Sequence, residues 1–140
     1  MDPTVELITA IFAKLRSIPA ITALVGAKIF DNPPTVTNAP SSPYISLGPS
    51  DDLTEDIECV DGVEATLQID CWSWGAGEHN SSAMVRKVAH EVKKALHNQE
   101  LPLTQNSLVL LKHNVTRFMR DENNAVNHAA ISITAILEEP

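Results

Sequence analysis

Five histidines are the residues of this sequence best suited to bind a transition metal or to transfer protons. They are His79, His90, His97, His113 and His128. His90 falls in a helical pattern, but the residue four positions later is Lys94, so the paired histidines of a helical zinc motif are missing. A lysine between His90 and His97 also opposes a bound cation. The histidines therefore predict no metal site.

A run of carboxylates is the second feature that could bind an ion. Residues 51–61 hold six acids and no Lys or Arg: Asp51, Asp52, Glu55, Asp56, Glu58 and Asp61. Carboxylates are hard ligands that suit calcium, but their spacing differs from that of an EF-hand loop and no glycine lies at the centre. We interpret residues 51–61 as a solvated loop or hairpin tip.

The motifs of nucleophilic and phosphate chemistry are missing as well. Gly75 and Gly77 are not followed by the lysine and hydroxyl of a phosphate-binding loop. Ser73 lies in Trp-Ser-Trp-Gly, which is not a nucleophile elbow. Paired acids at 138–139 lie at the chain end, a poor place for a buried carboxylate pair. We expect no catalytic centre and no cofactor.

Composition limits the function classes further. The 140 residues predict one domain over 1–140, with 44% hydrophobic and only 4% aromatic residues, so the core should be aliphatic. The net charge of −8 disfavours tight binding of nucleic acid, because an acidic surface repels phosphates. No apolar run approaches the ~20 residues of a membrane span. We expect a soluble protein made in a cytoplasm, without a signal peptide.

The elements that position these residues follow from periodicity. Alternating apolar residues at 63–71 predict a half-buried strand, whose apolar face includes Cys71 as a buried, inert thiol. A helix at about 3–17 begins at Asp2 and Pro3, and a further turn at 21–25 ends at Gly26. A long amphipathic helix covers about 81–98.

Other segments read as short strands, a loop and a hairpin. Residues 29–30 form a short extended piece, 32–43 a Pro-rich loop and 44–48 a strand. Residues 108–121 and 126–137 are long strands joined by a polar turn, which predicts a C-terminal hairpin at about 108–138. The fold class is α+β: a mixed or antiparallel sheet of four to five strands packed against one long helix, plus an N-terminal helix.

Two tryptophans lie next to the strand at 63–71. Trp72 and Trp74 alternate with Ser73 and should project on the same face. They form either a packed cover over the end of the sheet or an aromatic anchor for a partner.

Five segments together carry a resemblance through their order and spacing. They are Pro40 with 43–48, then 67–73, then 92–97, then 101–103, and finally Arg117, Arg120 and Asp121 with 126–128. This series resembles the tail-completion proteins of long-tailed phages, also called tail-terminator or tail-to-head joining proteins, which phage-like gene transfer agents share. The resemblance spans roughly 24–138, and Trp74 stands where the family often has a basic residue.

The resemblance implies a structural virion protein of the neck, at the head–tail junction, and not an enzyme. Family members form hexameric rings that seat on the last ring of the tail tube protein and stop its polymerisation. The other face of the ring meets the head connector, an adaptor or stopper protein. DNA passes through the lumen without specific binding, and no catalytic residue is carried over.

An acidic lumen would let DNA pass without binding. We therefore expect Asp51, Asp52, Glu55, Asp56 and Glu58 to lie near the lumen or an axial face of the ring. At the hairpin, we expect Arg117, Arg120, Asp121 and His128 to be solvated or to form contacts between subunits.

Three alternatives stay open. The chain could be another neck protein, such as a head-completion adaptor or stopper. It could be a monomeric binding module that presents Trp72 and Trp74. It could also be a small enzyme that uses His128, Asp121 and Arg120 at the hairpin.

Overall fold

Among the described residues, one five-stranded sheet, three α-helices and a short 3-10 helix, η2 (Gly77–His79), form the fold. The computed structural model describes residues 2–34, 40–54 and 61–140. The helices are α1 (Pro3–Arg16), α2 (Pro19–Val25) and α3 (Ala83–Leu96). The strands are β1 (Ile29–Phe30), β2 (Tyr44–Thr54), β3 (Gly62–Ser73), β4 (Ser107–Arg120) and β5 (Asn127–Glu138). The predicted α+β class, with an N-terminal helix and a helix on the sheet, is confirmed.

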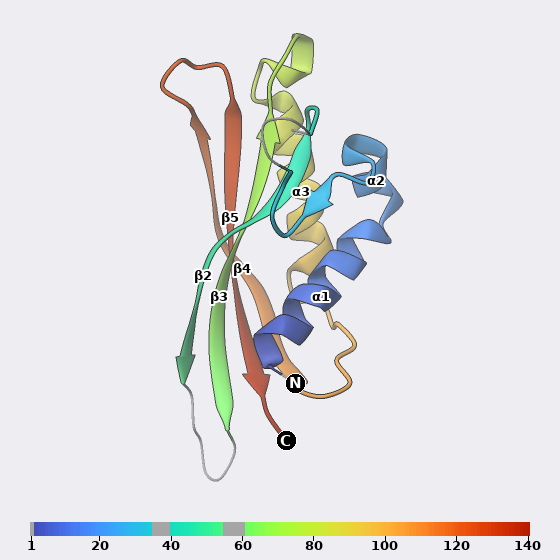
Figure 1. Cartoon of the computed structure of the whole chain (residues 1–140), viewed down its shortest axis with the longest axis vertical. Helices are drawn as coiled ribbons and strands as arrows, with labels where there is room; N and C mark the ends of the chain where they lie inside the picture. The colour runs from blue at the N-terminus through green and yellow to red at the C-terminus, as the bar shows by residue number, and fades with distance from the viewer. Residues whose placement is uncertain (1, 35–39, 55–60) are drawn as a thin grey trace.

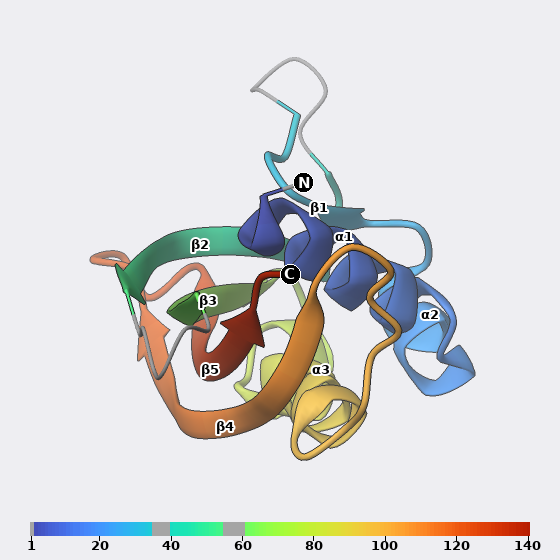
Figure 2. The same cartoon turned by 90° about the horizontal axis from the view of Figure 1, so that it is seen from below.

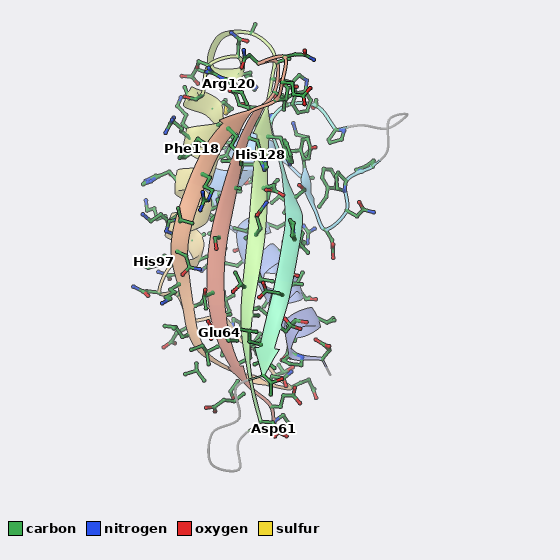
Figure 3. The ribbon with its side chains drawn as sticks, turned by 90° about the vertical axis from the view of Figure 1, so that its left-hand side faces the viewer. Asp61, Glu64, His97, Phe118, Arg120 and His128 are labelled. Atoms are coloured by element: carbon green, nitrogen blue, oxygen red, sulfur yellow. The ribbon has the colours of Figure 1, made fainter. Side chains whose placement is uncertain are left out.

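The sheet has the order β1-β2-β3-β5-β4, and only the β1–β2 pair is parallel. All three helices lie on one side of it, as Figures 1 and 2 show. The opposite side, seen face-on in Figure 3, carries no helix. Each strand therefore has a covered face, which the helices pack against, and an open face.

Alternation along β3 and β5 builds the covered face. Leu67, Ile69, Ile131 and Ile133 are at most 1% exposed. Of the other apolar residues at the same spacing, Val63 is partly buried and the rest are fully buried: Ala65, Cys71, Ala129, Ala135 and Leu137. The helix α3 adds buried side chains at positions three and four apart, which fit one face of a helix. Cys71 is buried in this core, and burial together with the nearby Asp70 raises the pKa of its thiol.

Local signals set the ends of the helices. The carboxylate of Asp2 accepts hydrogen bonds from the backbone amides of Thr4 and Val5 and caps α1. Gly26 ends α2 with a φ of 62°, a conformation that glycine adopts without strain.

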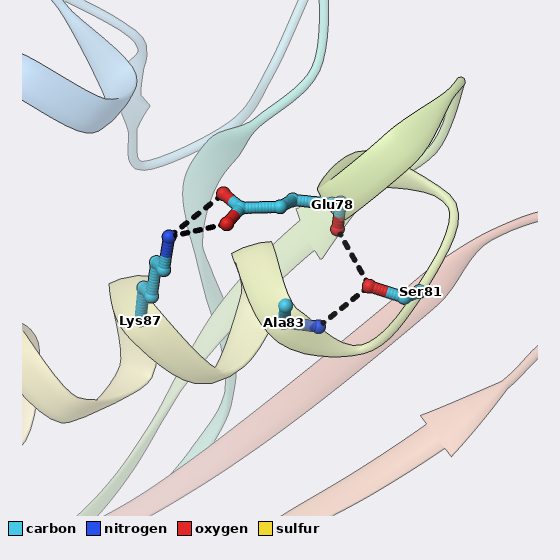
Figure 4. Close-up of polar contacts among 4 residues, drawn as sticks. All are labelled: Glu78, Ser81, Ala83 and Lys87. Carbon is cyan, nitrogen blue, oxygen red and sulfur yellow. Dashed lines mark hydrogen bonds and ion pairs between the residues drawn. The ribbon is translucent and has the colours of Figure 1, made fainter.

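The hydroxyl that caps α3 does not come from the residue at the N-cap position. Ser82 occupies that position without a side-chain cap, while Ser81 Oγ accepts from the amide of Ala83 and donates to the carbonyl of Glu78 (Figure 4). The carboxylate of Glu78 also forms an ion pair with Lys87 at 2.7 Å. The start of α3 is therefore tied to the preceding loop by two polar contacts.

Strand β2 is longer than the sequence predicts. For residues 51–54, the expectation of a solvated loop or hairpin tip is wrong, because Asp51 and Asp52 continue the strand as far as Thr54; residues 55–60 lie outside the described ranges. A register shift at Gly48 and Pro49 interrupts the alternation, which hides the rest of the strand from periodicity. Proline is tolerated there because this part of β2 is an edge.

Several residues singled out in the sequence lie outside the described ranges. They are Glu55, Asp56 and Glu58, together with residues 35–39 of the Pro-rich loop.

One buried carboxylate fastens α1 to the chain before β4. Glu6 accepts hydrogen bonds from the backbone amides of Thr104, Gln105 and Asn106 at 2.9 to 3.3 Å. Burial raises the pKa of Glu6, but the hydrogen bonds from Gln105, Thr104 and Asn106 outweigh it and lower the pKa to about 2. The ionised form of Glu6 is thus the one that this contact requires.

No single helix in the described part of the chain is long and apolar enough to cross a membrane. Only α1 and α2 taken together reach that length and composition, and they bend by 83° at their junction.

Candidate functional site

A polar and aromatic cluster occupies one end of the open face, near His128 in Figure 3. His128 Nε2 lies 2.6 Å from Asp70 Oδ1, and Gln68 donates to the same oxygen at 2.8 Å. The imidazole of His128 stacks on Trp72 with 3.9 Å between ring centres and 9° between planes. The indole of Trp72 donates to Ser46 Oγ at 3.0 Å. These contacts join β2, β3 and β5.

The cluster continues through Tyr44 and Trp74. Tyr44 stacks on Trp72 and meets Trp74 and Phe30 edge-on, with ring centres 5.8 to 6.2 Å apart. Burial, and then the charge of Asp70, raise the pKa of Tyr44. Trp72 and Trp74 are half-buried, so their rings cover this end of the sheet. A partner contact by either tryptophan stays a prediction.

Gly48 makes room for this cluster. A Cβ atom at Gly48 would lie 2.5 Å from Asp70 Oδ2, closer than two such atoms can approach. A side chain there would push Asp70 away from His128. The register shift in β2 and the position of Asp70 are therefore linked.

The tip of the β4–β5 hairpin separates the residues that a small enzyme would have to bring together. Asp121 Oδ1 accepts from the amides of Ala125 and Val126 and thereby closes the turn. Arg120 donates a hydrogen bond to Asn127, and both residues belong to the covered face. His128, the next residue in β5, lies on the open face. Arg120, Asp121 and His128 do not converge on a common point, so the geometry does not favour this alternative.

Asn127 is a structural residue that sequence reasoning missed. Its Nδ2 lies 3.0 to 3.1 Å from the carbonyls of His79, Asn80 and Ser81, and its Oδ1 accepts from Arg120. Asn127 therefore links the hairpin to the loop before α3. Its burial could have been inferred from its phase with Ala129 and Ile131 in the predicted strand.

A second cluster missed by the sequence analysis lies between α3 and β4. The guanidinium of Arg86 lies 4.1 Å from the ring centre of Phe118. His97 Nδ1 accepts from the amide of His113, whose own Nε2 lies 2.7 Å from Thr116 Oγ1. Burial, then the nearby Lys93 and His97, lower the pKa of His113, so the neutral form of His113 is favoured there.

The exposed acids of β2 and the exposed Arg117 lie on separate strands and do not form a catalytic arrangement among the described residues. Asp51 and Asp52 are exposed on β2, and Arg117 is exposed on β4. Among the described residues, no group of three or more His, Cys, Asp or Glu is arranged to hold a metal ion. Ser73 Oγ is fully buried and has no hydrogen-bond partner in the described part of the chain.

The comparisons with known proteins give one family match and a similar solved structure. The sequence matches the family described as "Tail completion protein gp17" over residues 9–138. A chain of the solved structure described as "Virion of native gene transfer agent (GTA) particle" is similar, with a TM-score of 0.86, 25% identity and 98% of each chain covered. No curated protein matches the sequence. Since the family match spans nearly the whole chain, this protein belongs to the gp17 family of tail completion proteins and is a structural virion protein of a phage-type tail.

Proposed function

We propose that this chain is a tail terminator: a single domain that assembles into a hexameric ring on the last ring of the tail tube protein. The ring stops polymerisation of the tube, and its other face joins the head connector, an adaptor or stopper protein. DNA passes through the lumen without specific binding. The observation that carries the proposal is the tail completion family match over residues 9–138.

The geometry supports an assembly role through its outer surfaces. One whole face of the sheet carries no helix, and β4 exposes Val109, Val115, Phe118 and Met119. Exposed apolar side chains on an edge strand favour contacts with another protein. A ring also needs two different surfaces on each subunit, because neighbours meet head to tail.

The acidic residues keep the role that the sequence suggests. We propose that Asp51, Asp52, Glu55, Asp56 and Glu58 lie near the lumen or an axial face of the ring. Acids there would repel the phosphates of passing DNA.

Negative-stain electron microscopy of purified protein mixed with preformed tail tubes tests the proposal. We expect rings at the ends of the tubes, and tubes that no longer elongate when more tube protein is added. Rings that bind only DNA-filled heads would instead identify an adaptor or stopper. Protein that stays monomeric beside uncapped tubes would contradict both roles and favour the monomeric binding module.

A further inference from the structure

The two edges of the sheet carry opposite charges. At one edge, β5 is the only strand that pairs with β4 in the described part of the chain, and the exposed cations of β4 are Lys112, Arg117 and Arg120. On its outer side, β4 is bonded at Leu111 and His113 to Asn98 and His97, which follow α3. At the other edge, β1 pairs with only two residues of β2, so the remainder of β2 is bonded on one side within the described residues. The exposed acids of that edge are Asp31, Asp51 and Asp52. We call these the basic edge and the acidic edge.

The same separation of charge is visible along the chain. Residues 86–120, which form α3 and β4, hold seven of the ten Lys and Arg residues and only two acids. Residues 29–85, which form β1, β2 and β3, hold ten acids and no Lys or Arg. The net charge of −8 therefore combines an acidic region at 29–85 with a basic region at 86–120.

The charges of the two edges lie at matching levels of the sheet. The strand pairing aligns Asp51 with Thr66, then Thr134, then Lys112, in one continuous rung. Asp51 and Lys112 also belong to the same open face, since residues on one rung point to the same side. A copy rotated about an axis along the strands would bring its Lys112 to the level of Asp51 in its neighbour.

A second pair of charges lies at nearby levels, one residue apart, rather than on a common rung. Arg117 shares a rung with Phe30, the last residue of β1, and Asp31 comes directly after it. In the described part of the chain, neither Arg117 nor Asp31 takes part in an ion pair. The same holds there for Asp51 and Lys112. These four charges are therefore available to a second molecule.

Apolar side chains match between the edges as well. Leu53 shares a rung with Leu110, and Val109 precedes Leu110 in β4. Leu53 is 60% exposed and Val109 is 56% exposed, although both are large apolar side chains. Contact between Leu53 of one copy and Val109 of the next would remove apolar surface from water.

We infer that a second copy of this chain docks its basic edge onto the acidic edge of the first, with Lys112 facing Asp51 and Arg117 facing Asp31. The inference rests on the proposed ring and specifies which two surfaces meet in it. An edge strand that reaches an axial face can also flank the next subunit, so the proposed position of Asp51 is compatible with this contact. The occupant is another copy because both complementary surfaces belong to one chain.

Side chains, rather than a shared strand ladder, make this contact. Strand β4 has register shifts between Leu108 and Leu110 and between His113 and Val115. Such bulges on an edge hinder continuous pairing with another strand. The specificity of the contact then comes from charge and apolar matching, and high salt should weaken its charged part.

Charge reversal at each edge tests the inference. The basic-edge variant is Lys112→Glu with Arg117→Glu, and the acidic-edge variant is Asp31→Lys with Asp51→Lys. The matched control, Lys14→Glu with Lys94→Glu, reverses two charges on the helices. Light scattering measures mass with and without tail tubes, microscopy scores capped tubes, and circular dichroism checks the fold.

We expect each edge variant to fold but to assemble at least about a hundredfold more weakly than the wild type, since like charges then face each other. Mixing the two edge variants should restore rings, because every contact in an alternating ring again joins opposite charges. The control should assemble like the wild type.

Two outcomes overturn the edge contact while the tail-terminator proposal stands. In the first, both edge variants form rings and cap tubes as the wild type does. In the second, the basic-edge variant forms rings but loses retention of added DNA, which would make DNA the partner of that edge. A wild type that neither assembles nor caps tubes overturns both proposals.

Discussion

The covered and open faces of the sheet are built from the same strands but from different chemistry. On the covered face, Leu67 and Ile131 are at most 1% exposed in an aliphatic core. On the open face, alternate positions such as Thr66, Gln68 and Ser132 are polar and partly exposed. The difference teaches that folding is specified mainly by one face. The other face carries the polar and aromatic contacts around His128, and we propose that the two edges serve contacts with other copies.

The largest expected effect on stability comes from a substitution that disrupts the packing of the covered face. Ile131→Ala should lower the free energy of unfolding by about 2–5 kcal/mol, because it leaves a cavity in a packed core. The neighbouring open-face change Thr66→Ala should cost less than about 1 kcal/mol. Urea unfolding followed by circular dichroism measures both. Equal losses in the two variants would contradict the division of roles between the faces.

The sequence predicts correctly those strands along which apolar and polar residues alternate without interruption. Alternation in β3 and β5 assigns their faces correctly, and Asp2 and Gly26 mark helix ends through local chemistry that needs no tertiary contact. The register shift at Gly48 and Pro49 interrupts this signal, and the polar residues after it have low strand propensity. The end of β2 was therefore not predictable from pattern alone.

The sites were less predictable than the fold because they depend on the order of the strands. His128 meets Asp70 only because β5 lies beside β3, and Glu6 meets a segment about a hundred residues away. The sequence also contains the separation of acidic and basic residues, but their placement on opposite edges requires the β1-β2-β3-β5-β4 order.

A smaller effect on stability is expected in the helical layer. There the carboxylate of Glu6, rather than apolar packing, fastens α1 to the chain before β4. Glu6 has a folded pKa of about 2 against an ordinary value of 4.5, so its ionised form stabilises the fold above the ordinary value. That stabilisation is lost as pH falls from about 4.5 toward about 2.

Glu6→Gln should therefore destabilise the protein at about pH 7 and make less difference at about pH 2.5. Urea midpoints at the two pH values measure the change. The control is Glu122→Gln, which makes the same substitution at an exposed position in the turn between β4 and β5. A gap between wild type and Glu6→Gln that widens in acid would refute the assigned role of Glu6.

The smallest effect compares two buried hydroxyls, one on each face. Ser46 on the open face accepts from Trp72, whereas Ser73 on the covered face has no partner among the described residues. Ser46→Ala should cost about 1 kcal/mol, and Ser73→Ala should be neutral or stabilise by about 1 kcal/mol. Thermal unfolding of both variants gives the sign. Destabilisation by Ser73→Ala of the size seen for Ser46→Ala would show that the hydroxyl of Ser73 is bonded.

The common rung of Asp51 and Lys112 has a consequence for how many copies can join. A head-to-tail contact between residues at different heights would give each added copy a vertical offset, and the assembly would grow as an open spiral. In the proposed edge contact, equal heights would give zero pitch, and a rotation that closes would then let the last copy meet the first and end growth. A protein with this property can stop a polymer without becoming one.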